Sequence, residues 1–182
     1  MMNQDVTLPL ARLACPAGTE PDAAHVEAFK RAMGLMAGAV TVITAGHNGA
    51  ARGLTATAVC SVSIAPPTLL ICVNKFGEAH DAIAGSGHFC VNILSEADRP
   101  VADRFAGREG LAGAEKFSGA RWISLASGSP ALEDALVNID CKVAEMVEAF
   151  THTVFFGTVL DVRLGETRPP LVHFDRAYRS IA

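Results

Sequence analysis

The sequence predicts a mainly β protein whose six or seven strands form a closed or split β-barrel. Short runs of β-branched and apolar residues recur along the chain, separated by glycine, proline and Asn-Gly turn signals. These runs do not alternate with long helical segments, which disfavours a doubly wound parallel sheet. A length of 182 residues is typical of one domain that buries a core and still holds a ligand cleft.

The chain is expected to begin with a flexible tail, residues 1–24, followed by one domain, residues 25–182. Prolines and a glycine in the first 21 residues suit a loose segment. Asp22 then caps a helix that runs to about Met36. The apolar residues of this helix fall on one face and are predicted to pack into the core: Val26, Phe29, Met33 and Met36.

The next part of the chain is predicted to contain four strands and a short helix. The β-branched run at residues 38–44 forms the first strand, and Asn48-Gly49 is a hairpin signal after it. A second strand runs from Leu54 to Ile64 and is stopped by Pro66-Pro67. A third strand, a brief helix ended by Gly85-Ser-Gly87, and a fourth strand follow at 68–73, 78–84 and 89–94.

The last part is predicted to contain one helix, a long loop and three strands. Ser95 caps a helix to Phe105, and the glycine-rich residues 106–130 form a loop that serves as a lid or an interface. Residues 136–147 alternate, with Val137 and Ile139 on one face and Asn138 and Asp140 on the other. The remaining strands lie at 153–162 and 171–174.

Composition excludes several classes of protein. The net charge is −4, no Lys/Arg cluster is present, and one Trp and one Tyr leave little for base stacking, so nucleic-acid binding is disfavoured. No apolar run approaches the roughly 18 residues of a membrane span, and the start does not resemble a signal peptide, so a cytoplasmic location is expected. A mean hydropathy of +0.29 indicates surface buried between subunits.

Metal and nucleophile chemistry also lack support. The five cysteines are scattered and form no CxxC pair, so Cys72, Cys90 and Cys141 are predicted to be buried free thiols. The histidines show no ligand spacing, and no metal is expected. HExxH, GxSxG, a Walker loop and a complete GxGxxG are all missing.

The most informative stretch runs from Gly53 to Pro67, where small and hydroxylated residues follow one another. A strand of this kind exposes backbone N–H and C=O groups to a flat ligand such as an isoalloxazine ring. From composition alone, an ordinary strand with a polar face is the favoured explanation of the stretch.

A set of segments in fixed order is similar to the short-chain flavin reductase family. These proteins are the reductase components of two-component flavin-dependent monooxygenases, and the subgroup in question acts in 4-hydroxyphenylacetate hydroxylation and pyrimidine breakdown. The segments are Phe29–Met33, Val40–Thr44, Thr55–Val62, Pro66–Asn74, Cys90–Leu94, Arg104–Gly107, Ala135–Cys141, Thr151-His152 and Phe174–Tyr178.

The resemblance implies an FMN-binding split barrel of Greek-key type, a homodimer, and hydride transfer from NADH to FMN, with FAD as an alternative flavin. The reduced flavin would pass to a partner monooxygenase. Two other functions stay open: a flavin carrier or sensor without NADH turnover, and a flavin-dependent reductase of a metal cofactor such as a cobalt corrin.

The resemblance also implies a site. Asn74, Lys75, Gly77 and Ala79 are expected near the flavin phosphate, although many relatives carry Ser and Thr where this chain has Gly77 and Ala79. His152 is expected to position the nicotinamide, and Phe150 stands where relatives have glycine. The residues expected along the flavin are Thr55, Ala56, Thr57, Ala58, Val59, Cys60, Ser61, Val62 and Ser63, with Phe105.

Overall fold

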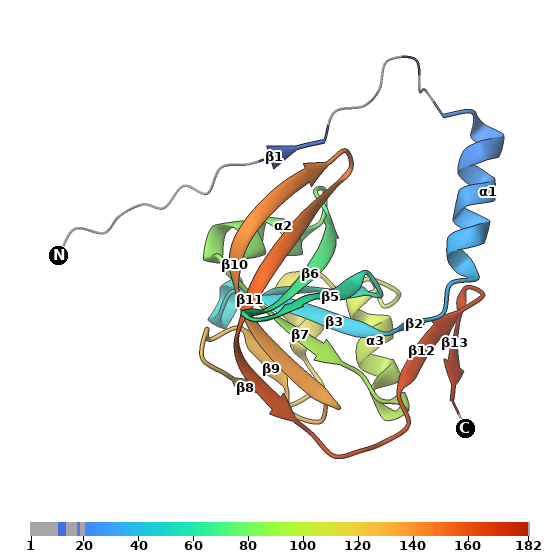
Figure 1. The fold of residues 1–182 in the computed structure, drawn as a ribbon. Helices are drawn as coiled ribbons and strands as arrows, with labels where there is room; N and C mark the ends of the chain where they lie inside the picture. Colours follow the sequence, from blue (N-terminus) through green and yellow to red (C-terminus); the bar gives the residue numbers. More distant parts are fainter. Residues whose placement is uncertain (1–10, 14–17, 19–20, 182) are drawn as a thin grey trace.

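A computed structural model describes residues 11–13, 18 and 21–181 of the chain, except for the side chain of Asn48. Its main sheet has the strand order β4-β3-β7-β10-β11-β6-β5, and β1 pairs with β10 (Figure 1). The strands of this sheet are β1 (Ala11–Arg12), β3 (Thr41–Ala45), β4 (Arg52–Ala56), β5 (Val59–Ile64), β6 (Pro67–Asn74), β7 (His88–Ile93), β10 (Val137–Ala149) and β11 (His152–Leu164).

The remaining strands form two small sheets. One contains β13 (Ala177–Ser180), β12 (Leu171–Phe174) and β2 (Gly38–Ala39), and the other pairs β8 (Trp122–Ser124) with β9 (Pro130–Leu132). Strands β8, β9 and β13 were not predicted, because each is only three or four residues long and lacks a clear apolar alternation. The mainly β class is confirmed.

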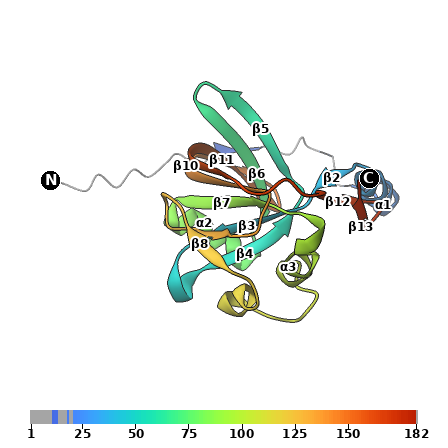
Figure 2. The same ribbon diagram turned by 90° about the horizontal axis from the view of Figure 1, so that it is seen from below.

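The predicted strand from Leu54 to Ile64 is two strands, separated by a bend at Thr57-Ala58. The hydroxyl of Thr41 in β3 donates to the carbonyl of Ala56 at 2.8 Å, whereas the N–H of Cys72 in β6 donates to that of Ala58 at 3.1 Å. Because these two partners lie at opposite ends of the strand order, the chain must cross from one edge of the sheet to the other here. The sheet is therefore split rather than closed at this bend (Figure 2).

Two apolar clusters fill the molecule. One lies between the main sheet and helix α2 (Glu78–Ser86) and contains Phe89, Phe155 and Ile71, all fully buried. The other lies under helix α3 (Arg99–Phe105), where Phe105 packs edge-on against Phe117 and Trp122. Helix α2 lies close to its predicted bounds, and Gly87 ends it in the left-handed conformation, with φ 67°. Helix α3 begins at Arg99 rather than directly after Ser95, because a 3-10 turn occupies Glu96–Asp98.

Helix α1 (Ala23–Gly34) forms as predicted, and the side chain of Asp22 accepts the N–H of Ala24 at 3.2 Å. The prediction that its apolar face enters the core is wrong, because Phe29, Met33 and Met36 are 63%, 43% and 66% exposed. The helix stands beside the barrel (Figure 1), and the N–H of Asp175 donates to the carbonyl of Gly34 at 2.7 Å at its end. Helical periodicity finds an apolar face but does not say what covers it.

The N-terminal segment is not loose where it is described. Ala11 and Arg12 pair in parallel with Val147 and Glu148 of β10, and Arg12 lies 3.0 Å from the Glu148 carboxylate. The residues of the expected tail at 1–10, 14–17 and 19–20 lie outside the described residues. No helix in the described part of the chain is both long and apolar enough to cross a membrane.

The first hairpin differs from its predicted geometry. Strands β3 and β4 do pair antiparallel, but a 3-10 turn at Asn48–Ala50 joins them, and the positive φ of 74° falls on Gly46 rather than on the Asn-Gly pair. The glycine is needed there, since a Cβ would lie 2.7 Å from the carbonyl oxygen of Ala50.

The predicted free thiols are found, although they are not equally buried. Cys90 and Cys141 are fully buried, Cys72 is partly buried and Cys60 is exposed; none of these four forms a disulfide. Burial and the nearby Asp140 raise the pKa of Cys141 to about 12 and raise the pKa of Cys90 as well.

These two pKa shifts predict a stability loss at high pH. A raised folded-state pKa stabilises the fold fully below the thiol's ordinary pKa of 9.0 and progressively less as the pH rises towards about 12.

We expect iodoacetamide at pH 8 to modify Cys60 in the native protein and to leave Cys90 and Cys141 unmodified until the chain is unfolded. Peptide mapping by mass spectrometry checks this, and rapid labelling of Cys141 in native protein would contradict it.

Candidate active site

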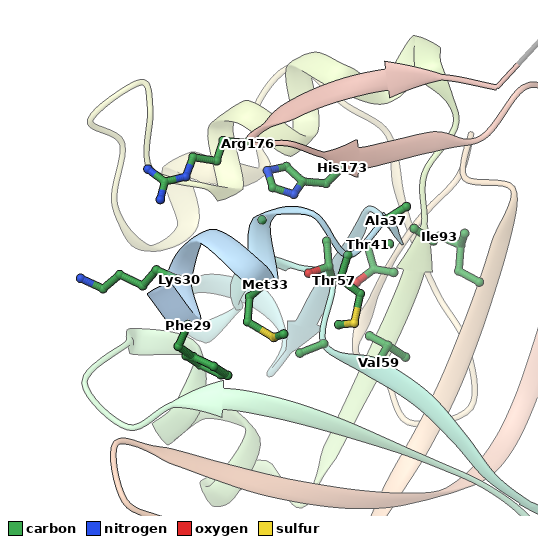
Figure 3. Close-up of a pocket in the computed structure, with 15 residues that line it drawn as sticks. Phe29, Lys30, Met33, Ala37, Thr41, Thr57, Val59, Ile93, His173 and Arg176 are labelled. Carbon is green, nitrogen blue, oxygen red and sulfur yellow. The ribbon is translucent and has the colours of Figure 1, made fainter. Parts of the chain in front are cut away.

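A cavity of about 900 Å³ lies between α1, the β4–β5 bend and the β12–β13 hairpin. Figure 3 shows Phe29 and Met33 of α1 on one side, Thr57 and Val59 at the bend, and Arg176 of the hairpin at the rim. Its volume lies in the range of cofactor and small-molecule sites, and its walls are mostly apolar.

A second hollow of about 210 Å³ lies on the other side of Thr57. It is lined by Thr55 and Ala56 of β4, by Arg108, and by Tyr178 of β13, and it shares Thr57 and His173 with the larger cavity. The Tyr178 ring faces the Arg99 and Arg108 guanidinium groups, with Cζ atoms 5.6 and 4.9 Å from its centroid. Burial raises the pKa of Tyr178, so its hydroxyl stays protonated at neutral pH.

The structure brings five of the predicted flavin residues together around these hollows. Thr57, Ala58 and Val59 line the larger cavity, and Thr55, Ala56 and Thr57 line the smaller one. Thr55 uses its hydroxyl to hold α3, donating to the carbonyl of Ala102 at 2.6 Å. The bend therefore presents small side chains to both hollows.

The other residues expected along the flavin lie elsewhere. Cys60, Ser61, Val62 and Ser63 continue along β5, an exposed arm of the β5–β6 hairpin, and do not line either hollow (Figure 2). Phe105 is 3% exposed within the aromatic cluster, and a Cβ on Gly53 would lie 2.6 Å from its ring. Phe105 therefore supports β4 from behind.

The residues that were expected near the flavin phosphate form a second cluster at the end of β6. The side chain of Asn74 accepts the N–H of Phe76 at 2.9 Å, and Lys75 Nζ lies 3.9 Å from the Glu148 carboxylate. Gly77 is the N-cap of α2 and Ala79 is buried in its first turn. The helix N-terminus lacks a side-chain cap, so its N–H groups and Lys75 are the donors available to a phosphate.

His152 lies at the same end of the sheet, because it pairs with Asn74 in the β11–β6 register. Its Nδ1 lies 2.8 Å from the hydroxyl of Thr151, and its side chain is exposed. Phe150 has a left-handed φ of 56°, a conformation that glycine adopts without steric cost.

Sequence reasoning missed several residues of the larger cavity. Phe29 and Met33 were assigned to the core, while His173 and Arg176 received no role. His173 reaches the site through long-range pairing, since it lies opposite Gly38 in the β12–β2 register. The one signal in the sequence was the apolar stripe of α1, which could cover a ligand or a partner as well as pack into the core.

A split barrel with a small-residue bend over a cavity of this size defines a class of β proteins with a hollow in the range of small-molecule sites. Within that class, the chain belongs to the flavin reductase-like domain family, which matches residues 33–182. This membership confirms the resemblance identified in the sequence.

Three comparisons illustrate the family. "FMN reductase (NADH) RutF 2" of Rhizobium rhizogenes is 35% identical over 95% of this chain and 98% of its own length. The solved structure of a putative flavin reductase from Haemophilus somnus 129PT has a TM-score of 0.82 at 36% identity, covering 86% of this chain and 99% of that one. Nitrilotriacetate monooxygenase component B from Mycobacterium thermoresistibile has a TM-score of 0.80 at 32% identity, covering 89% of each chain.

Proposed function

We propose that this protein is an NADH-dependent flavin reductase that reduces FMN, or FAD, and supplies the reduced flavin to a partner monooxygenase. Relatives at this level of identity are named FMN reductases that use NADH, and a structural neighbour is a monooxygenase component. The single observation that supports the site is the small-residue bend at Thr57-Ala58-Val59, which opens onto a cavity large enough for a flavin ring.

The flavin supplies the hydride-accepting ring, so the protein needs no nucleophile of its own. Its task is to hold the dihydronicotinamide C4 about 3–3.5 Å from flavin N5 and to exclude water. The small side chains at Thr57 and Ala58 leave room for a ring against the bend, and Phe29 and Met33 provide an apolar wall opposite. Among the described residues, no group of three or more metal-ligating side chains lies together.

The test is NADH oxidation followed at 340 nm with and without added FMN, together with the flavin spectrum under anaerobic conditions. The proposal predicts flavin-dependent oxidation and bleaching of the flavin absorbance. A carrier or sensor would bind flavin without bleaching, and a corrin reductase would need the metal cofactor as acceptor for full turnover. The names of the relatives favour flavin reduction over both alternatives.

His152 is proposed to position the nicotinamide at the edge of the site. We expect His152→Gln to raise the KM for NADH about tenfold and to leave the flavin dissociation constant unchanged, since the residue is not placed against the flavin ring. Steady-state kinetics and a flavin fluorescence titration check this split. His47→Gln, at the exposed turn between β3 and β4, is the matched control, and equal effects of both variants would contradict the role.

We also propose that the protein is a homodimer located in the cytoplasm. The support is exposed apolar side chains outside the cavity: Ile64 at the β5–β6 hairpin and Leu164 at the end of β11 are 92% and 77% exposed. Free rather than paired cysteines suit a reducing compartment. Light scattering is expected to give twice the chain mass of 19.0 kDa, and Ile64→Asp to shift it towards the monomer; a wild-type mass of one chain would contradict the dimer.

A further inference from the structure

The turn that joins β12 to β13 adopts an unusual backbone conformation. Asp175 and Arg176 have φ of 50° and 58°, so both lie in the left-handed region. Two-residue hairpin turns of this kind favour Asn-Gly or Asp-Gly, because glycine reaches positive φ without steric cost. This chain has an arginine at the position that best suits glycine, and such outliers concentrate at functional sites.

The Arg176 side chain lies at the rim of the 900 Å³ cavity. Its Cγ is 3.5 Å from the point where a Cβ on Gly34 would lie, so the aliphatic part runs along the end of α1. In Figure 3 its guanidinium and the ammonium of Lys30 extend away from Thr57 and Val59.

The Arg176 guanidinium forms no ion pair within the described part of the chain; its charge, after that of Lys30, helps to lower the pKa of Glu27. No described carboxylate lies within 4.0 Å of its guanidinium, whereas Lys30 forms an ion pair of 2.7 Å with Glu27. Glu27, Asp175 and Arg176 also line a separate hollow. His173, from the same hairpin, also lines the cavity. The cavity thus combines an apolar interior with an unpaired cation at its rim.

We propose that Arg176 is an anion subsite that binds a phosphate group of the nucleotide whose ring occupies the cavity. A guanidinium donates two parallel hydrogen bonds to phosphate oxygens, and the apolar walls accept a planar ring. The subsite is distinct from the Lys75 cluster, which follows the C-terminal end of β6 and lines neither hollow. The inference rests on the proposed function, because it takes the cavity to be a nucleotide site.

The phosphate has two possible sources, the monophosphate of FMN and the pyrophosphate of NADH. Riboflavin separates them, because it carries the same ring as FMN without a phosphate. If Arg176 holds the flavin phosphate, Arg176→Gln raises the KM for FMN about tenfold and leaves that for riboflavin unchanged. If it holds the pyrophosphate, the KM for NADH rises to the same extent with either flavin.

Arg176→Gly provides the sharpest test. Glycine relieves the left-handed strain, so this variant is expected to melt about 2–4 °C higher than the wild type while binding the phosphate-bearing substrate as poorly as Arg176→Gln. A higher Tm with a weakened KM separates loss of binding from loss of fold. Arg176→Lys keeps the charge and should recover part of the affinity, and Arg168→Gln, whose arginine pairs with Glu166, is the control for loss of a surface charge.

Two results would contradict the inference, one at the subsite and one at the proposed function on which it rests. If wild-type protein oxidises NADH with FMN but both Arg176 variants keep the KM for FMN and for NADH within about twofold of wild type, the subsite is absent. If the wild type shows no flavin-dependent oxidation, the proposed function fails first. Raised ionic strength gives an independent readout, because it should raise the wild-type KM more than that of Arg176→Gln.

Discussion

Ala58→Trp is expected to abolish flavin-dependent NADH oxidation while the protein remains folded. Ala58 lies in the bend between β4 and β5, is exposed, and lines the cavity. An indole at this position would occupy the space needed by the isoalloxazine ring and displace it from the nicotinamide. Because hydride transfer depends on close alignment of the two rings, we expect kcat/KM to fall at least about 100-fold.

Flavin fluorescence titration and NADH oxidation measure this effect, with far-UV circular dichroism as the check on folding. Ala144→Trp is the matched control, since Ala144 is exposed on β10 and lines neither hollow at the bend. If Ala58→Trp binds and reduces FMN like the wild type, the bend is not the flavin floor.

Asn92→Ala is expected to cause the largest loss of stability. Asn92 is fully buried in β7, and its Nδ2 donates to the Val42 carbonyl at 2.8 Å. Its Oδ1 accepts the N–H of Leu132 at 2.7 Å and the Nδ2 of Asn138 at 2.8 Å. Removing the amide takes these hydrogen bonds from the Leu132 N–H and the Val42 carbonyl and leaves Asn138 Nδ2 with the Leu132 carbonyl alone, which should lower the free energy of unfolding by about 3–5 kcal/mol.

Urea denaturation measures the loss, and a cycle with Asn138→Ala tests its origin. Because Asn92 and Asn138 share one hydrogen bond, the double variant should be less destabilised than the sum of the single variants. Glu145→Ala, at an exposed position of β10, is the control and should change stability little. A loss below about 1 kcal/mol for Asn92→Ala would mean that water replaces the lost amide.

Local pattern predicted most strands and helices because their apolar alternation and caps are local properties. It did not predict what surrounds them. Asn138 and Asp140 alternate with apolar residues as expected, yet both are fully buried. They bind partners from other segments: Asp140 accepts the N–H and hydroxyl of Ser127, both at 2.6 Å. The polar residues of this strand therefore belong to a buried hydrogen-bond network. Whether such residues face solvent or a network depends on the tertiary structure, not on the strand pattern.

In the candidate site, too, some features could be predicted from the sequence and others depend on the tertiary structure. The small-residue stretch was visible in the sequence. The bend at Thr57 was not, because it forms where the chain stops pairing with β3 and begins to pair with β6. Arg176 and His173 lie more than a hundred residues further along the chain and join Thr57 only because β12 pairs with β2. No local signal carries that information.

The central claim is that the β4–β5 bend cradles the flavin, and a crystal structure of the protein with bound FMN tests it most directly. We predict density for the isoalloxazine ring in van der Waals contact with Thr57, Ala58 and Val59, with one face left open. A flavin ring bound at any other part of the molecule, with the bend covered by side chains, would contradict the account.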